Sequence, residues 1–272
     1  MLGLIIFLGS FAGILSAFFG VGGGILIVPG LYVLFPNLSP QVVITCSLGL
    51  IFFNSSINLY NFTKMNLKPS SAIVITVGVA TIVGALLGAM IVSYVAPQII
   101  KNLFAVFAIL IVIKLIRDSK KPTPGDNTPP AYSRAKVPAY FLTGFLGGLL
   151  SGLTGLGGGA VMIPLFISML KINLRFIPVY SNGAMIFATG SGLFLHLFQK
   201  DSDISSLPEI FHRFQVGHLN ILITFLLLIG AFSCSKFGAK LSIKVAHEKK
   251  RIAFIILLLT ISSKIILGNF MN

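Results

Sequence analysis

The sequence predicts an all-α polytopic membrane protein, and three observations carry that prediction. The 272 residues are 56% hydrophobic and only 10% charged, with a mean hydropathy of +0.99 that the surface of a soluble globular protein does not carry. Long apolar stretches recur along the chain, each near the roughly 20 residues that a spanning helix needs. A glycine-rich motif occurs twice, once in each half of the sequence.

The apolar stretches predict helices, because the period-2 alternation of a membrane β-barrel is absent. Six of them cover residues 42–60, 72–94, 99–116, 177–198, 216–234 and 252–267. Two further segments, residues 2–35 and 137–170, are 34 residues long and are interrupted by glycines. We therefore expect a glycine-broken helical hairpin followed by three spanning helices in each half, about 8–10 membrane segments in all.

The two halves are copies of one unit. A shift of 135 residues places Gly9, Gly13, Leu15, Ser16, Gly20, Gly22, Gly23, Gly24 and Pro29 on Gly144, Gly148, Leu150, Ser151, Gly155, Gly157, Gly158, Gly159 and Pro164. The same shift carries the triplet Thr45-Cys46-Ser47 onto Tyr180-Ser181-Asn182. A shift of 150 aligns GAMIVSYVAP with GAKLSIKVAH further along. We expect a first membrane repeat over residues 1–116, a polar linker loop over 117–136 and a second repeat over 137–272.

Basic residues in short loops indicate how the copies face the membrane. If each glycine segment crossed once, the 20 Lys and Arg residues would divide 11 to 9 between the two sides. If each segment returns to its own side, the same residues divide 16 to 4. This bias favours the second arrangement, which makes the repeats inverted and leaves both termini of a multi-pass protein extracytoplasmic. Because the net charge of +14 lies in such loops, no nucleic acid partner is expected.

The glycine runs GVGGG, from Gly20, and GLGGG, from Gly155, predict helix breaks at membrane depth. Each break releases backbone N–H and C=O groups that must line a cavity or be covered, since lipid cannot bond them. The half-helix after each break would aim free N–H groups and its positive dipole end at that place, which suits an anion. The lysine of a phosphate loop is missing. Helix contacts through Gly9 and Gly13 would explain only the first glycines of the motif.

Polar residues inside the predicted spans are neutral hydroxyls and amides, which can bind an oxyanion and still release it; alternatively, they only join helices. All six carboxylates lie in loops or at span edges, so we expect no metal site, no cofactor and no enzyme activity. His196 either carries a coupling proton or is a satisfied interfacial residue. The candidate substrate-binding residues are Ser16, Gly20, Gly22, Gly23, Gly24, Thr45, Cys46 and Ser47 in the first copy and Ser151, Thr154, Gly155, Gly157, Gly158, Gly159, Tyr180, Ser181 and Asn182 in the second.

The paired motifs GxxxGxLSxxxGxGGGxxxxP at Gly9 and Gly144, each followed by a small polar triplet, resemble the sulfite exporter TauE/SafE family, also called the sulfonate-uptake permease family. The resemblance covers nearly the whole chain. It implies a secondary transporter of small sulfur-containing anions, such as sulfite, sulfate, thiosulfate or organosulfonates, working in export or uptake in the bacterial cytoplasmic (inner) membrane. The ATS-like triplet of the family reads Thr45-Cys46-Ser47 in the first copy but Tyr180-Ser181-Asn182 in the second, which changes both its size and its donors.

We therefore expect alternating access, in which one repeat moves against the other around an anion held near the bilayer midplane. A passive anion channel and a transporter of another small organic anion stay open as alternatives. A membrane assembly or receptor factor is the rival from another class, and it would call for a large extramembrane domain. The expected partners are the anion and the lipid bilayer, with a coupling proton and a homodimer left open.

Overall fold

The computed structural model describes residues 1–91, 109, 112–113, 116–117, 130–173, 175–199, 207–245, 248–249, 252–253, 255–256, 259–260 and 263. The first half holds α1 (Leu2–Phe19), α2 (Gly24–Leu34), α3 (Pro40–Lys64) and α4 (Ser71–Ile91). The second half holds η3 (Arg134–Lys136), α6 (Val137–Thr154), α7 (Gly159–Ser168), α8 (Ile177–Leu197), α9 (Glu209–His212), β1 (Gln215–Val216), β2 (Leu219–Asn220) and α10 (Ile221–Lys244). Most of the predicted spans at 99–116 and 252–267 and of the linker at 117–136 lies outside the described residues.

The prediction of an all-α polytopic membrane protein is confirmed. Five helices among the described residues are long and apolar enough to cross a membrane: Leu2–Phe19, Pro40–Lys64, Ser71–Ile91, Arg134–Thr154 and Ile221–Lys244. The helix α8 is also 21 residues long but more polar, and 13 of its residues are buried. Because its neighbours cover it, α8 does not need a fully apolar surface.

The last of these helices is shifted from the apolar stretch that predicted it, residues 216–234. The strands β1 and β2 pair as a short antiparallel hairpin over Gln215–Asn220, with Gly217 at a positive φ of 56° in the turn. Asn220 then begins α10, because its side chain accepts a hydrogen bond from the N–H of Ile223. At the other end, Lys236 and Lys240 lie inside the helix, since long basic side chains can reach the interface from a spanning helix.

Each glycine motif turns the chain back on itself. Gly20 and Gly23 are left-handed, with φ of 79° and 80°, and they separate α1 from α2. The two helices run antiparallel, because Gly23 packs against Ala12 and Gly30 against Leu8. The returning helix has only 11 residues, which is about 16 Å of helix and too short to cross the bilayer. The helices α6 and α7 repeat this arrangement around the left-handed Gly155 and Gly158.

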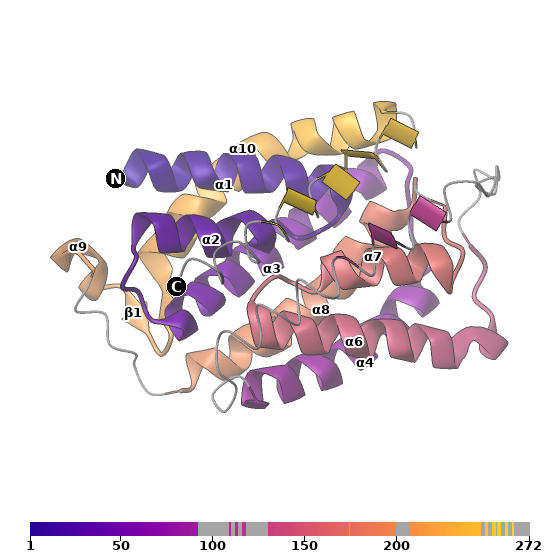
Figure 1. Ribbon diagram of the computed structural model, residues 1–272, viewed down its shortest axis with the longest axis horizontal. Helices are drawn as coiled ribbons and strands as arrows, with labels where there is room; N and C mark the ends of the chain where they lie inside the picture. The colour runs from indigo at the N-terminus through magenta and orange to yellow at the C-terminus, as the bar shows by residue number, and fades with distance from the viewer. Residues whose placement is uncertain are drawn as a thin grey trace.

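The first helix of each copy packs along a helix of the other copy, in parallel. In the α1–α10 pair, a Cβ at Gly9 would collide with the Leu227 carbonyl, and in the α4–α6 pair a Cβ at Gly144 would collide with the Val77 carbonyl. Further along, Gly13 meets Ala231 and Gly148 meets Thr81 in the same way. The shifts of 135 and 150 residues therefore relate two versions of one interface. Figure 1 shows α1 and α10 along the top of the molecule and α4 and α6 along the bottom.

The helices α3 and α8 cross the middle of the bundle. Their directions are opposite, because Asn58 meets Asn182 near one end of the pair while Leu48 packs against Gly192 near the other. Buried apolar side chains pack on both sides, one cluster reaching Val77 and Phe166 and the other reaching Ile27 and Leu227. An antiparallel central pair is what inverted copies require, and the relation of the copies to the membrane plane stays a prediction.

Basic residues gather at one end of the bundle, which we call the basic end. It is formed by the end of α3, the starts of α4, α6 and α8 and the end of α10, with Lys64, Lys68, Lys136, Lys171 and Lys244. The N-terminus, α9 and β1 lie at the opposite end, on the left in Figure 1. This separation follows from the returning hairpins, which keep both ends of each glycine segment on one side.

We expect the close helix pairs to tolerate no side chain at their glycines. Replacing Gly9 by Ala should destabilise the detergent-purified protein by about 1–3 kcal/mol, because the new methyl group overlaps the α10 backbone. Thermal unfolding followed by circular dichroism measures the effect. The matched control is Gly3→Ala, since nothing lies within 4 Å of a Cβ at Gly3. Equal melting temperatures for the two variants would contradict the packing.

Cysteine labelling tests which end faces the cytoplasm. Lys68 and Arg213 are exposed at opposite ends, and Cys46 is buried. In a background in which Cys234 is Ser, a membrane-impermeant thiol reagent should label Arg213→Cys in intact cells and Lys68→Cys only after the membrane is opened. This expectation follows because basic loops stay in the cytoplasm. The reverse pattern would invert the predicted orientation.

Candidate functional site

The two glycine turns meet at the centre of the bundle, where each lies against the other. A Cβ at Gly24 would lie 2.7 Å from the Leu156 Cα, and a Cβ at Gly159 would lie 2.7 Å from the Gly20 carbonyl oxygen. The backbone of one copy thus contacts the backbone of the other at both places. The structure brings together all eight glycines of the predicted site, and each of them is buried.

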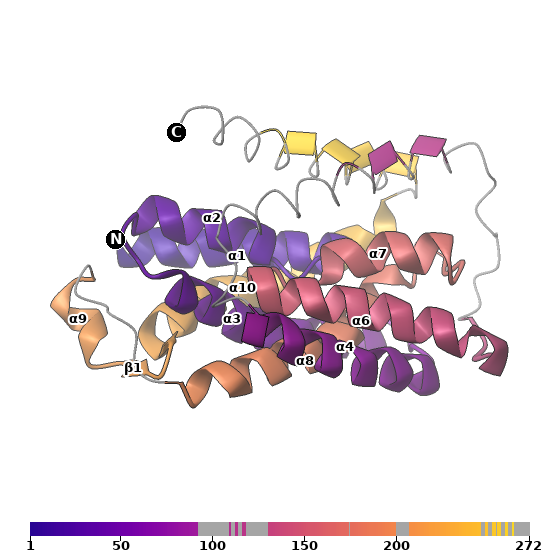
Figure 2. The same cartoon turned by 60° about the horizontal axis from the view of Figure 1, so that its bottom comes forward.

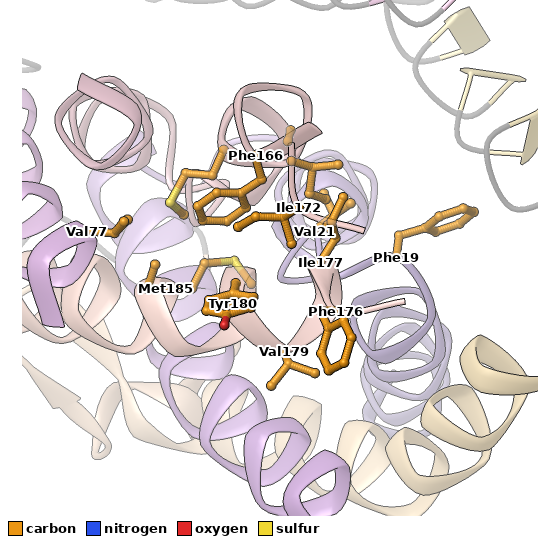
Figure 3. Packing of buried hydrophobic residues seen from close by; sticks show 14 of the residues in the cluster. Phe19, Val21, Val77, Phe166, Ile172, Phe176, Ile177, Val179, Tyr180 and Met185 are labelled. Carbon is orange, nitrogen blue, oxygen red and sulfur yellow. The ribbon is translucent and has the colours of Figure 1, made fainter. Parts of the chain in front are cut away.

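Two side chains from the central helices cover these turns. A Cβ at Gly22 would lie 2.7 Å from the Met185 Sδ, and a Cβ at Gly157 would lie 3.0 Å from the Ile51 Cδ1. Ile51 and Met185 are both fully buried, and Figure 3 shows Met185 in the apolar cluster that also contains Val21. The released backbone groups of the turns are therefore covered by protein.

The short helices α2 and α7 begin at these turns and point their N-termini toward each other. Figures 1 and 2 show them extending from the centre of the bundle toward opposite ends. In the part of the chain that the structure describes, the backbone N–H groups of Gly22 to Ile25 donate no hydrogen bond, nor do those of Gly157 to Ala160. Two positive dipole ends and two sets of unbonded donors therefore converge.

Formal charges are absent from this centre among the described residues. The described carboxylates, Glu209 and Glu248, are both exposed, and none of the described Lys and Arg side chains is buried. An anion here would be held by dipoles and neutral donors alone, so it would not face a strong salt bridge that hinders release.

One serine of each triplet bonds the opposite turn. The Ser47 hydroxyl donates to the Gly155 carbonyl at 2.7 Å, and the Ser181 hydroxyl donates to the Gly20 carbonyl at 2.5 Å. Ser47 therefore corresponds to Ser181, a shift of 134, and not to Asn182 as the shift of 135 predicted. The second copy has one residue fewer between its glycine turn and its serine, and a loop can absorb that difference while a helix cannot.

Asn58 links two more predicted residues. Its Nδ2 donates to the Ser16 hydroxyl and to the Asn182 Oδ1, both at 3.1 Å. The Asn182 Nδ2 in turn donates to the Pro178 carbonyl at 2.6 Å. This network joins α1, α3 and α8 close to the Gly20 turn, and all three of its polar side chains are fully buried.

Other predicted residues have different partners. The Thr45 and Thr154 hydroxyls bond carbonyls of their own helices, at Gln41 and Leu150. The Cys46 Sγ lies 3.6 Å from the Asn220 carbonyl, on the side of α10. The Tyr180 hydroxyl accepts from the N–H of Ser70 at 2.8 Å, before α4, and its ring packs near Phe166 (Figure 3). Ser151 is buried and its hydroxyl has no partner among the described residues.

Residues of α3 and α8 that were not in the predicted set also belong to this region. Ile51 and Met185 contact the turns, Asn58 bonds Ser16, and Asn54 lies on the same face of α3 as Ile51 and Asn58. The sequence spacing could have identified three of them, Ile51, Asn54 and Asn58. Ser47, Ile51, Asn54 and Asn58 follow one another at spacings of four, three and four residues, which is one face of a helix. Met185 carried no such polar signal, because an apolar side chain in an apolar span is ordinary.

His196 lies near the end of α8 and is buried. Its Nδ1 lies 3.0 Å from the Gln199 Oε1 and 3.4 Å from the His218 Nδ1, while its Nε2 has no partner among the described residues. It is thus paired at the end opposite to the basic end and does not contact the glycine turns. No group of three metal-ligating His, Cys, Asp or Glu side chains occurs in the described ranges.

The duplicated hairpins, the spanning helices and the covered central turns define a polytopic membrane protein built from two related halves. The chain belongs to the sulfite exporter TauE/SafE family, whose model matches residues 5–265. This membership confirms the resemblance in the paired glycine motifs.

Curated relatives agree with that class. The chain is 32% identical over 242 residues to a probable membrane transporter protein of Haemophilus influenzae, covering 88% of this chain and 85% of that protein. It is 28% identical over 260 residues to one of Methanocaldococcus jannaschii, covering 93% and 90%. It is 26% identical over 289 residues to the probable membrane transporter protein YunE of Bacillus subtilis, covering 97% and 96%. No solved structure matches the chain.

We expect the reciprocal serine bonds to stabilise the contact between the copies. Ser47→Ala and Ser181→Ala should each lower the unfolding free energy by about 1–3 kcal/mol, because each leaves a buried carbonyl without its donor. Denaturation of the detergent-purified protein measures the change. Ser56→Ala on α3 is the control, since the Ser56 hydroxyl bonds only the Phe52 carbonyl of its own helix. A loss no larger than in this control would show that the bonds between copies add little.

Proposed function

We propose that this protein is a secondary transporter that moves small sulfur-containing anions, such as sulfite, sulfate, thiosulfate or an organosulfonate, across the cytoplasmic membrane. One observation carries the proposal: two helix N-termini with unbonded N–H groups converge where no formal charge lies among the described residues. Such a place favours an anion of low basicity. Membership of the sulfite exporter TauE/SafE family supports the choice of a sulfur oxyanion.

The proposed binding groups are the N–H groups of the two glycine turns together with the hydroxyls of Ser47 and Ser181. In the described arrangement each serine bonds a carbonyl of the opposite turn. Rotation of a hydroxyl about its Cα–Cβ bond would let it donate to an anion instead. The anion would thus replace a contact between the copies, which links binding to their relative movement.

Alternating access accounts for the covered state of the turns. Ile51 and Met185 close the centre from the central helices, so an anion would enter only when one repeat moves against the other. A passive channel would need an open path past both side chains. The covered centre favours the transporter, and the basic end would face the cytoplasm.

Flux of sulfite in proteoliposomes tests this function. The wild-type protein should concentrate sulfite when a proton gradient is imposed, whereas a passive channel would only equilibrate it. Gly158→Leu should abolish the flux, because Gly158 has a φ of +71° and a Cβ there would collide with the Gly147 carbonyl. Gly3→Leu is the control. Insertion is checked by detergent extraction and gel filtration, and full flux in an inserted Gly158→Leu protein would refute the site.

A further inference from the structure

Three neighbouring side chains on α3 carry buried polar atoms for which the described structure offers no partner. They are both amide atoms of Asn54, the hydroxyl of Ser55 and the Oδ1 of Asn58. All three residues are fully buried. A buried polar atom without a hydrogen bond is destabilising, so a cluster of such atoms in a native protein requires an explanation, such as a bound ligand or water. Two of these atoms are oxygens that can only accept.

Their position relates them to the glycine turns. Asn54 follows Ile51 by three residues and precedes Asn58 by four, so it lies on the same face of α3. The Ile51 side chain covers the turns at Gly22 and Gly157, while Asn58 bonds Ser16. Asn54 therefore stands next to the covered centre, between the turns and the Asn58 network.

The hydrogen-bond network fixes which atom of Asn58 is left over. The Pro178 carbonyl can only accept, so the Asn182 amide must turn its Nδ2 toward it. The Asn182 Oδ1 then faces Asn58 and requires a donor, which is the Asn58 Nδ2 at 3.1 Å. The remaining Asn58 oxygen is buried and needs a hydrogen-bond donor that the described residues do not supply.

The other copy lacks this polar group. At the shift of 134 that relates the two serines, Asn54 and Asn58 correspond to Ala188 and Gly192. Gly192 packs against Leu48, the counterpart of Asn182. Ser55 corresponds to Thr189, whose hydroxyl is bonded to the Met185 carbonyl at 2.7 Å. At these positions the two ends of the central α3–α8 pair thus differ: one carries unbonded acceptors, and the other carries Ala188, Gly192 and a hydroxyl that is already bonded.

We propose that Asn54, Ser55 and Asn58 form a subsite for the part of the substrate that carries its own hydrogen-bond donor. This inference rests on the proposed function, since the glycine turns would hold the charged oxygens. The substrate class is then narrower: a hydroxylated or amino-bearing sulfonate, or a protonated oxyanion, is preferred to an anion with acceptors only. The subsite belongs to one copy, so the anion binds in one orientation.

A matched pair of probes tests the subsite. Ethanesulfonate and 2-hydroxyethanesulfonate differ by one hydroxyl donor, and each is added as a competitor of sulfite flux in proteoliposomes of the full chain. We expect the hydroxylated compound to inhibit the wild-type protein at about tenfold lower concentration, because the other compound leaves buried acceptors unpaired. Equal inhibition by both would overturn the subsite and would mean that bound water already satisfies those acceptors.

Variants distinguish an effect on substrate preference from an effect on protein stability. Asn54→Leu should reduce the tenfold preference to about twofold or less. It should also raise the melting temperature of the protein without ligand, because it removes an unpaired buried amide. Ser55→Ala provides a milder second variant, with the same direction of change in preference. Thr189→Val, in the other copy, is the control and should keep the preference. An unchanged preference in both α3 variants would overturn the proposal.

The outcome also distinguishes this inference from the proposed function. If the protein transports sulfite and both sulfonates inhibit that flux equally, the proposed transport function stands and the proposed subsite is wrong. If the folded wild-type protein transports no sulfite and neither sulfonate shifts its melting temperature, both the proposed function and the proposed subsite are wrong.

Discussion

The structure depends on one constraint: backbone groups that leave a helix inside the membrane must be covered. Each glycine turn removes several N–H groups from helical bonding, and a turn facing lipid would be strongly destabilising. The turn of one copy is covered by the turn of the other, by Ile51 and Met185, and by a serine from the opposite copy. The requirement to cover the turns therefore explains why the two copies meet at their centres and not along their outer faces.

The pairing of the outer helices supports the same contact. Because α1 lies along α10 and α6 along α4, each copy is held by the other at the edge of the bundle as well as at its middle. Close backbone approach through glycines gives these pairs large contact areas without bulky side chains. Because each of these pairs joins the two copies, a movement of one repeat against the other would change the packing at these edges as well as at the central α3–α8 contact.

Much of this architecture could be predicted from periodicity and from the repeat. The glycine spacing predicted the hairpins, and the charge bias predicted that they return to their own side. The one-residue change in register between Ser47 and Ser181 could not be predicted, because the loop before each helix sets its rotation. The hydrogen-bond partners of Cys46 and Tyr180 could not be predicted either, because they are Asn220 and Ser70, which are distant in the sequence. Asn58 and Asn54 could have been found from the helical face that starts at Ser47.

The exchange of contacts between the copies has a consequence for the ancestry of the chain. A single unit would leave its glycine turn uncovered, so an unfused ancestor would have needed a second molecule inserted in the opposite direction. Two identical molecules would have had identical residues at the positions now occupied by Asn58 and Gly192. Two copies of the gene could differ in sequence, which two molecules from one gene could not. The residues Asn58 and Gly192 now differ, so the two ends of the central pair no longer present the same groups to a substrate.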